Sequence, residues 1–241
     1  MKILTDLHTH TCASTHAYST IMENTAYASQ IGVEAIAMTD HTPGLEDGAH
    51  RWHFYNQNVL PPVINGVHVL KGAEVNIIDI DGGLDLRQEY LERLDWVVVS
   101  YHSYALRDPC TKSRRTQCYI NLLSNPHVDM LGHCGSPIFD FDIDAVLDAA
   151  KANDKVIEIN ENSFSARGEN IEICRNIAIT CGEKGVRISV DSDAHFCQSI
   201  GHFPRSIEML EDIGFPEELI VNTDWTKLKD YLNNRKSGKT V

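Results

Sequence analysis

The sequence predicts an α/β protein in which parallel strands form a TIM-like barrel with helices outside it. Three observations support this fold class. Seven short β-branched runs alternate with longer segments of helical period over the 241 residues. Several of these runs are apolar throughout, as expected for parallel strands buried on both faces. Polar or ionisable residues follow each run. An open, doubly wound sheet stays open as the alternative, because a sequence separates the two architectures poorly.

The predicted elements follow from local hydropathy. The seven strands are Ile3–Leu7, Ala35–Met38, Val67–Ala73, Trp96–Ser100, Val128–Leu131, Val156–Ile159 and Arg187–Val190. Four helices are predicted where apolar residues recur at intervals of three and four, at Ile143–Ala150, Ile171–Cys181, Ile207–Ile213 and Leu228–Leu232. No repeat, low-complexity tract or linker interrupts the chain, so we expect one domain over residues 1–241.

Composition excludes several classes of protein. There are 21 Lys and Arg residues against 34 Asp and Glu residues, and the net charge of −13 disfavours nucleic-acid partners. The longest apolar runs are too short to span a membrane. The N-terminus turns polar at once and does not resemble a signal peptide. Seven cysteines without a C-x-x-C pair predict free thiols and a cytoplasmic location.

Polar side chains follow every predicted strand at its carboxyl end. In chain order these segments are Asp6-Leu7-His8-Thr9-His10, Thr39-Asp40-His41, Glu74, His102, His133, Asn160-Glu161-Asn162 and Asp191-Ser192-Asp193-Ala194-His195. The carboxyl ends of the strands in a parallel barrel lie on one face, which forms the active-site rim. We therefore expect these groups to share one site.

The residue types at these strand ends predict a metal site. His8 and His10 have strand spacing, so both imidazoles point the same way. Glu74 and Asp193 add hard oxygen ligands, and a mixed imidazole and carboxylate set suits zinc, manganese or iron. Cys134 should point to the opposite face from its neighbour His133. The other histidines, His50, His68, His127 and His202, are interpreted as ordinary surface or hydrogen-bonded residues.

The strand-end segments together resemble a known family. Asp6-Leu7-His8-Thr9-His10, Thr39-Asp40-His41, Glu74, His102, Gly132-His133 and Ser192-Asp193-Ala194-His195 are similar to the four motifs of the PHP (polymerase and histidinol phosphatase) family. Trp52-His53-Phe54, Glu158-Ile159-Asn160, Ser163-Phe164 and the segment Asp212–Pro216 resemble its YcdX-like branch of small bacterial phosphatases. The resemblance implies a distorted (β/α)7 barrel, a trinuclear cluster of divalent metals, often zinc, and by analogy a trimer.

The resemblance also implies a ligand set. His8, His10, Glu74 and Asp193 would hold the first metal, and Glu74, His102 and His133 the second, with Glu74 bridging. His16, His41 and His195 would hold the third. The proline that often follows the fifth-strand histidine in relatives is Cys134 here, which leaves open whether the site is sensitive to oxidation.

The expected mechanism is hydrolysis of a phosphate monoester by a metal-bridging hydroxide held at Glu74. Asp6 and Asp40 are expected to orient imidazoles. Arg167 is the favoured phosphate clamp, since arginine pairs bidentately with phosphate, and Arg51 is a weaker candidate. His53 could contact substrate or donate a proton to the leaving oxygen. Arg107 and the run Lys112-Ser113-Arg114-Arg115 either line the rim or form a solvated surface.

Several functions remain open at this point. The favoured one is a metal-dependent phosphomonoesterase acting on small phosphorylated molecules. Within the same superfamily, a histidinol-phosphate phosphatase and a nuclease or phosphodiesterase compete, and the charge of −13 disfavours the nuclease. A non-catalytic metal-binding protein and an amidohydrolase are further alternatives. The amidohydrolase would usually require a strand lysine as a metal bridge, and none is evident.

Overall fold

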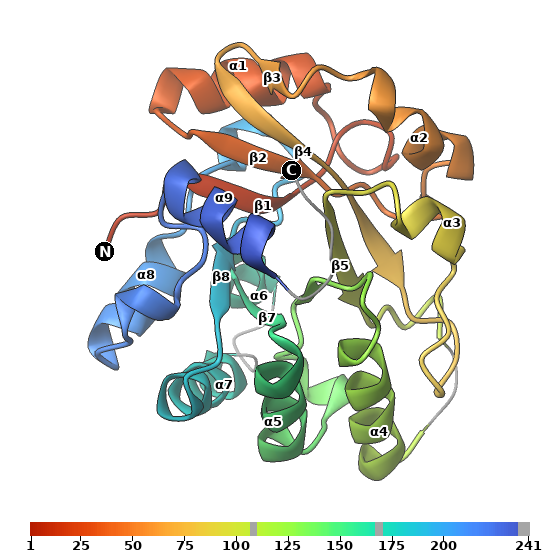
Figure 1. Ribbon diagram of the computed structural model, residues 1–241, viewed down its shortest axis with the longest axis vertical. Helices are drawn as coiled ribbons and strands as arrows, with labels where there is room; N and C mark the ends of the chain where they lie inside the picture. The colour runs from red at the N-terminus through yellow and green to blue at the C-terminus, as the bar shows by residue number, and fades with distance from the viewer. Residues whose placement is uncertain (107–109, 167–170, 236–241) are drawn as a thin grey trace.

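The computed structural model describes residues 1–106, 110–166 and 171–235. Seven parallel strands pair in the order β1-β2-β4-β5-β6-β7-β8 (Figure 1). Their bounds are β1 Thr5–Thr9, β2 Ala35–Met38, β4 Val67–Asn76, β5 Trp96–Ser100, β6 Met130–Leu131, β7 Val156–Asn160 and β8 Ile188–Asp191. An isolated bridge joins Thr9 to Ala194, and the Leu7 amide donates to the Asp191 carboxylate at 2.6 Å. The first and last strands are therefore neighbours, and the predicted TIM-like barrel is confirmed as a nearly closed one.

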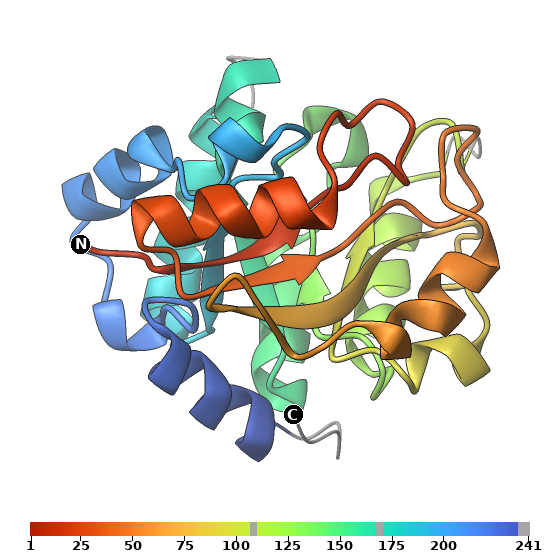
Figure 2. The ribbon, with the colours of Figure 1, turned by 90° about the horizontal axis from the view of Figure 1, so that it is seen from above.

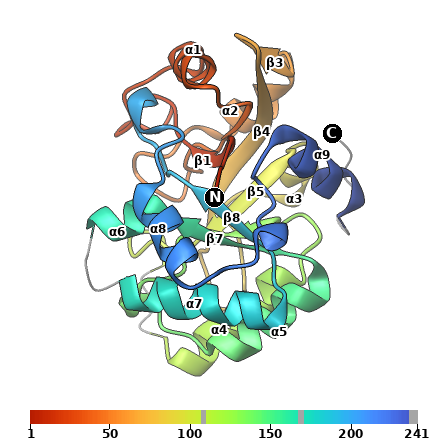
Figure 3. The ribbon, with the colours of Figure 1, turned by 90° about the vertical axis from the view of Figure 1, so that its left-hand side faces the viewer.

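Helices surround this sheet. The α-helices are α1 Ile21–Ile31, α2 Arg51–Asn56, α3 Gln88–Leu91, α4 Lys112–Leu123, α5 Ile143–Asn153, α6 Glu161–Ala166, α7 Ile171–Lys184, α8 Pro204–Asp212 and α9 Trp225–Asn234. Figure 2 shows α1 lying along β1 and β2, and Figure 3 shows α4, α5 and α7 gathered on the opposite side of the barrel. No helix within the described ranges combines the length and the apolar content needed to cross a membrane.

Alternation along β5 shows how the sheet divides two apolar layers. Val97 and Val99 pack outward in the layer that includes α4, α5 and α7, whereas Trp96 and Val98 pack in a separate inner cluster. The inner cluster also contains Leu228 of α9. Apolar side chains thus fill the barrel interior below the carboxyl ends of the strands. The polar residues of the site therefore lie at the carboxyl ends, above this apolar layer.

A short antiparallel strand, β3 (Val63–Ile64), was not predicted. It pairs with the start of β4 across a two-residue turn formed by Asn65 and Gly66. These residues have φ of 51° and 80°, the left-handed pair that a type I′ hairpin turn requires. The Asn-Gly dipeptide was the available signal for this hairpin.

Element boundaries and two of the longer helices differ from the sequence prediction. β1 lies two residues later than predicted, and β4 extends three residues further, through Glu74 to Asn76. The helix α1 was not predicted because polar Asn24 and Thr25 occupy buried positions on it. The helix α4 was missed because it begins with the basic run Lys112-Ser113-Arg114-Arg115, capped by Thr111.

Close packing at the end of β6 gives a testable expectation. A methyl group on Gly132 would lie 2.4 Å from Ser100 Oγ and 2.7 Å from Val98 Cγ1. We expect Gly132→Ala to lower the free energy of unfolding by about 1–3 kcal/mol through overpacking. Gly182→Ala, in α7, is the matched control, because its new methyl would make only ordinary contacts of 3.5 Å or more. Urea denaturation of both variants measures the difference, and equal stabilities would contradict the expectation.

Candidate metal centre

The carboxyl ends of the strands bring five imidazole rings into a closed circle. Ring centroids lie 5.2 Å apart for His8 and His10, 4.5 Å for His10 and His41, and 5.3 Å for His41 and His102. The circle continues at 5.1 Å from His102 to His133 and returns at 6.1 Å from His133 to His8. Residues up to 125 positions apart in the chain therefore face one another.

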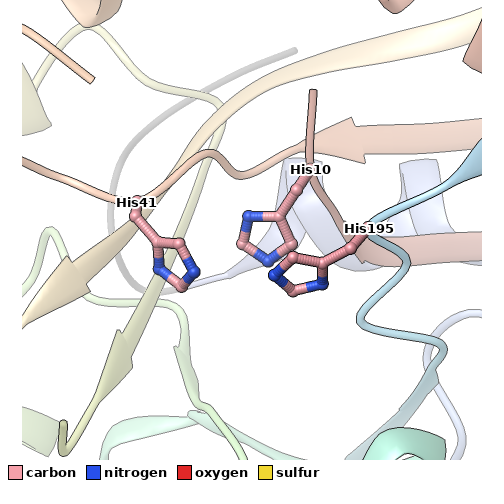
Figure 4. Close-up of side chains that lie close together, drawn as sticks. All are labelled: His10, His41 and His195. Atoms are coloured by element: carbon pink, nitrogen blue, oxygen red, sulfur yellow. The ribbon is translucent and has the colours of Figure 1, made fainter. Parts of the chain in front are cut away.

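Two further imidazoles, from His16 and His195, extend the circle on one side. The His195 ring lies 4.2 Å from His10 and 4.3 Å from His16, and His16 lies 5.2 Å from His41. Figure 4 shows His10, His41 and His195 turned toward a common space, and one ring nitrogen from each lies within 4.8 Å of the others. The loop after β1, which carries His16, therefore joins the site together with the strand ends.

Glu74 in β4 lies at the centre of the cluster. Its Oε1 is 2.8 Å from His133 Nε2 and 3.4 Å from His102 Nε2. Its Oε2 is 2.8 Å from His41 Nδ1 and 3.4 Å from His8 Nε2. The two oxygens of one carboxylate thus face two different groups of imidazoles, which is the arrangement expected of a carboxylate that bridges two cations.

Asp193 supplies the second carboxylate. Its Oδ1 lies 3.1 Å from His10 Nε2 and 3.7 Å from His8 Nε2. Asp193 has φ of 55°, and His133 has φ of 24°, so both adopt left-handed backbone conformations that disfavour residues other than glycine. Such strain is found where the position of a side chain is fixed by its function.

Hydrogen bonds donated by Nδ1 fix the orientation of several rings. His8 Nδ1 donates to Glu158 Oε1 at 2.7 Å, and His102 Nδ1 donates to Asn76 Oδ1 at 2.7 Å. His195 Nδ1 donates to the Asp193 carbonyl at 2.9 Å. With the proton on Nδ1, each ring presents the lone pair of Nε2 to the centre, as a metal ligand must.

Some of the buried ring nitrogens lack a hydrogen-bond partner within the described part of the chain. They are His8 Nε2, His10 Nδ1 and His195 Nε2. Leaving such an atom unpaired costs about 1–3 kcal/mol, and coordination to a cation would offset that cost. The donor set of imidazoles and carboxylates, with these unpaired atoms, fits divalent transition metals.

The pKa values around Glu74 reflect the same electrostatics. Burial opposes ionisation of Glu74, yet the imidazoles of His8, His41 and His102 hold its pKa well below the usual range. Burial alone would lower the pKa of His133, but the Glu74 carboxylate outweighs it and raises that pKa to about 9. Burial dominates at His102, whose pKa falls to about 4. The ionised carboxylate therefore favours positive charge beside it, an environment that also stabilises a bound cation.

The two aspartates expected to orient imidazoles have different contacts. Asp6 accepts hydrogen bonds from the Ser192 amide and hydroxyl and from the Gly201 amide, and no contact with an imidazole ring is found among the described residues. The Asp6 carboxylate therefore fixes the turn before Asp193 and also accepts from the backbone amide of His8, and its action on an imidazole ring stays a prediction. Asp40 contacts the ring of His53 at 3.1 Å and also binds the loop after His10.

The residues predicted to contact substrate either lie outside the described residues or do not line the cavity over the cluster. Arg107 and Arg167 lie outside the described residues. Arg51 is exposed at the first residue of α2, and it does not line the cavity at the cluster. His53 lines a different cavity, beside Trp52 and Tyr55. Of the basic run, Lys112 pairs with Asp140 at 3.2 Å and Arg115 binds carbonyl oxygens, which agrees with a surface run and not with a rim.

The expected orientation of Cys134 agrees with the structure, and no disulfide occurs among the described cysteines. Cys134 is buried in the outer apolar layer, whereas its neighbour His133 contacts Glu74. Burial raises the pKa of the Cys134 thiol well above its usual value. A buried thiol of high pKa forms little thiolate, so the structure gives no support for oxidation at this position.

Three residues that orient the proposed ligands were not predicted as part of the site. Glu158 contacts His8, Asn76 contacts His102, and Asp47 contacts His16. Only Glu158 had a clear signal in the sequence, since a glutamate inside the apolar strand Val156–Asn160 needs a buried partner.

A barrel whose strand ends and the loop after β1 present seven histidines and two carboxylates around one space belongs to the class of proteins suited to bind divalent cations. The chain matches the PHP domain over residues 6–173 and belongs to the PHP family, as predicted. Relatives include a probable phosphatase of Acetivibrio thermocellus, 44% identical over 236 residues and covering 98% of each chain. Another is a probable phosphatase of Caldanaerobacter subterraneus subsp. tengcongensis, 45% identical over 238 residues and covering 98% of this chain and 93% of the relative.

A solved structure has the same fold at low identity. Histidinol phosphate phosphatase of Lactococcus lactis, complexed with zinc, L-histidinol and phosphate, aligns with a TM-score of 0.59 at 15% identity. The alignment covers 88% of this chain and 94% of that one. At this identity the likeness supports the fold.

Proposed function

We propose that this protein is a metal-dependent phosphatase that hydrolyses phosphate monoesters of small molecules. The observation that carries the proposal is the position of Glu74, whose two oxygens face separate groups of imidazoles at the carboxyl ends of the strands. The close relatives named as probable phosphatases support the reaction class.

The proposed cofactor is three divalent metal ions, with zinc favoured and manganese or iron as alternatives. The proposed ligands are His8, His10, Glu74 and Asp193 for one ion, Glu74, His102 and His133 for the second, and His16, His41 and His195 for the third. When bound, such ions would lower the pKa of a water molecule and stabilise charge on phosphoryl oxygens. Zinc in the structure of the L. lactis phosphatase supports this choice of metal.

The side chains around the cluster leave a cavity in which a phosphorylated small molecule would bind. A cavity of about 450 Å³ lies over the cluster and is lined by Glu74, His102 and His133. That volume suits a small molecule, and the net charge of −13 argues against a nucleic-acid substrate. The proposed function does not depend on Arg167 as a phosphate clamp or on His53 and Arg51 as substrate contacts.

We further propose that residues 1–241 act as one PHP domain. Two proposed ligands, Asp193 and His195, lie beyond residue 173, where the family match ends. The pairing of Thr9 with Ala194 holds them beside His10. The last part of the chain therefore belongs to the same catalytic unit.

Removal of metal tests the proposal. We expect purified protein to contain about two to three transition metals per chain, and chelation to abolish hydrolysis of p-nitrophenyl phosphate until zinc or manganese is added back. His10→Ala should lose activity in the same way, whereas His68→Ala should keep it, because His68 stacks on Trp225 outside the cluster. Elemental analysis and a colorimetric assay measure both effects. Full activity in metal-free protein would overturn the mechanism, and metal-loaded but inactive protein would favour a non-catalytic metal-binding role.

A further inference from the structure

A second cavity, of about 610 Å³, opens beside the metal centre. It shares four wall residues with the cavity over the cluster, namely His16, Asn162, Asp193 and His195. Since the two cavities have this wall in common, a molecule with its phosphoryl group at the cluster could extend past His195 into the second cavity. The chemistry of that cavity would then decide which phosphate esters bind.

The second cavity contains the guanidinium of Arg205, the second residue of α8. Its Nη1 donates to the carbonyl oxygen of Phe164 at 2.5 Å, which holds the side chain in place. Within the described ranges the guanidinium makes no ion pair, so its other N–H groups are available to a ligand in the cavity. A guanidinium held by one hydrogen bond to a neutral acceptor keeps its full charge and most of its planar set of donors.

Glu161 is the carboxylate in the part of this cavity that is not shared with the cavity over the cluster. Both of its oxygens already accept hydrogen bonds from backbone amides. Its Oε1 accepts from the Arg205 backbone amide at 3.2 Å, and its Oε2 accepts from the Ser206 amide at 2.9 Å. Glu161 therefore caps the first turn of α8, where the positive end of the helix dipole offsets its charge. The Arg205 side chain is not neutralised by it.

The remaining wall suits the carbon skeleton of a small molecule. Tyr18 and Phe196 are 77% and 45% exposed and give the cavity apolar sides, and His202 and Ser199 add polar groups near Arg205. On a protein of net charge −13, an anion needs a local cation to bind. Arg205 is such a cation, next to the proposed metal centre.

We propose that the second cavity binds a second anionic group of the substrate, a carboxylate or another phosphate, through Arg205. The inference rests on the proposed function and narrows it: the preferred substrates are phosphate monoesters of small molecules that carry one more negative group. Arg205 is then a specificity-determining residue, because guanidinium pairs bidentately with either anion.

Three ligands built on one skeleton test the proposal. They are the phosphonate analogues of glycerol 3-phosphate, 3-phosphoglycerate and glycerol 1,3-bisphosphate, the last with both phosphates replaced by phosphonates. The far end of the three molecules is a hydroxymethyl group, a carboxylate and a phosphonate, respectively. Calorimetry with the zinc-loaded full chain should give a Kd about 10- to 100-fold lower for at least one doubly anionic analogue than for the glycerol analogue, as charge-assisted hydrogen bonds predict. The analogue with the larger gain identifies the preferred anion.

Variants assign the gain to a residue. The measured ratio is the Kd of the glycerol analogue divided by the Kd of the better doubly anionic analogue. Arg205→Gln should bring this ratio close to 1, and Arg205→Lys should leave it between 1 and the native value. Arg175→Gln, on α7 away from both cavities, should leave the ratio unchanged. Equal Kd values for all three analogues, or a ratio unaltered in Arg205→Gln, would overturn the inference. So would an equal weakening of all three, because Arg205 would then bind the group they share.

Hydrolysis of the three parent esters judges the proposed function separately. Turnover of all three at similar kcat/KM, with equal binding of the analogues, supports the phosphatase and overturns the second-anion site. A large Kd ratio that Arg205→Gln removes, without turnover of any ester, supports the anion site and overturns the phosphatase.

Discussion

Glu74→Gln is expected to lower kcat/KM for p-nitrophenyl phosphate by about 1000-fold or more, since losing a metal-held transition state costs several kcal/mol. Glutamine keeps the shape of the side chain but loses its charge and one of its two acceptor oxygens. Both oxygens of Glu74 are engaged, Oε1 with His133 and His102 and Oε2 with His41 and His8. An amide nitrogen cannot ligate a cation in place of either oxygen.

Metal content and activity should fall together in Glu74→Gln. Elemental analysis should show fewer metal ions per chain than in the native protein, and excess zinc should not restore activity. Glu208→Gln, an exposed position on α8, is the matched control and should behave as the native protein does. If Glu74→Gln kept both its metal and its turnover, a bridging role for Glu74 would be excluded.

The groups at the strand ends could be predicted from the sequence, because a regular strand fixes where its last residues point. His8, His10 and Glu74 follow from that geometry alone. The left-handed conformations of His133 and Asp193 could not be predicted, since they depend on contacts from other segments. The His133 amide, for example, donates to Glu158, 25 residues further along the chain.

The wall around the cluster was harder to predict for the same reason. Candidates for the phosphate contact were sought in loops that follow strands, where Arg167 was favoured over Arg51. Arg205, the contact proposed for a second anion, was overlooked because it lies inside the first turn of a helix. Its place at the cavity depends on Glu161 and Phe164, which are close to it only in the folded chain. The fold class was simpler, because seven strand periods and their alternation with helices are local properties.

Glu158→Gln is expected to lower metal affinity by about 10- to 100-fold, the usual effect of changing a residue that orients a metal ligand. Glu158 accepts from His8 Nδ1 at 2.7 Å with one oxygen and from the His133 amide at 2.5 Å with the other. A glutamine amide has one acceptor and one donor, so its NH₂ group must face one of these two donors. If it faces His8, the ring relieves the clash by moving its proton to Nε2, where it blocks the nitrogen that faces Glu74.

The effect of Glu158→Gln should differ in kind from that of Glu74→Gln. Because Glu158 positions ligands and is not itself a ligand, excess zinc should restore most of the activity of Glu158→Gln, with a shifted metal titration curve and a nearly native kcat. If the NH₂ group of the glutamine faces the His133 backbone amide instead, the hydrogen bond that holds His133 at φ of 24° is lost. The melting temperature of the variant should then fall. Zinc titration with activity as the readout, beside a thermal melt and the Glu208→Gln control, separates these outcomes. An unchanged titration midpoint would show that Glu158 does not position His8, and a defect that zinc cannot rescue would place Glu158 among the groups acting directly at the reacting centre.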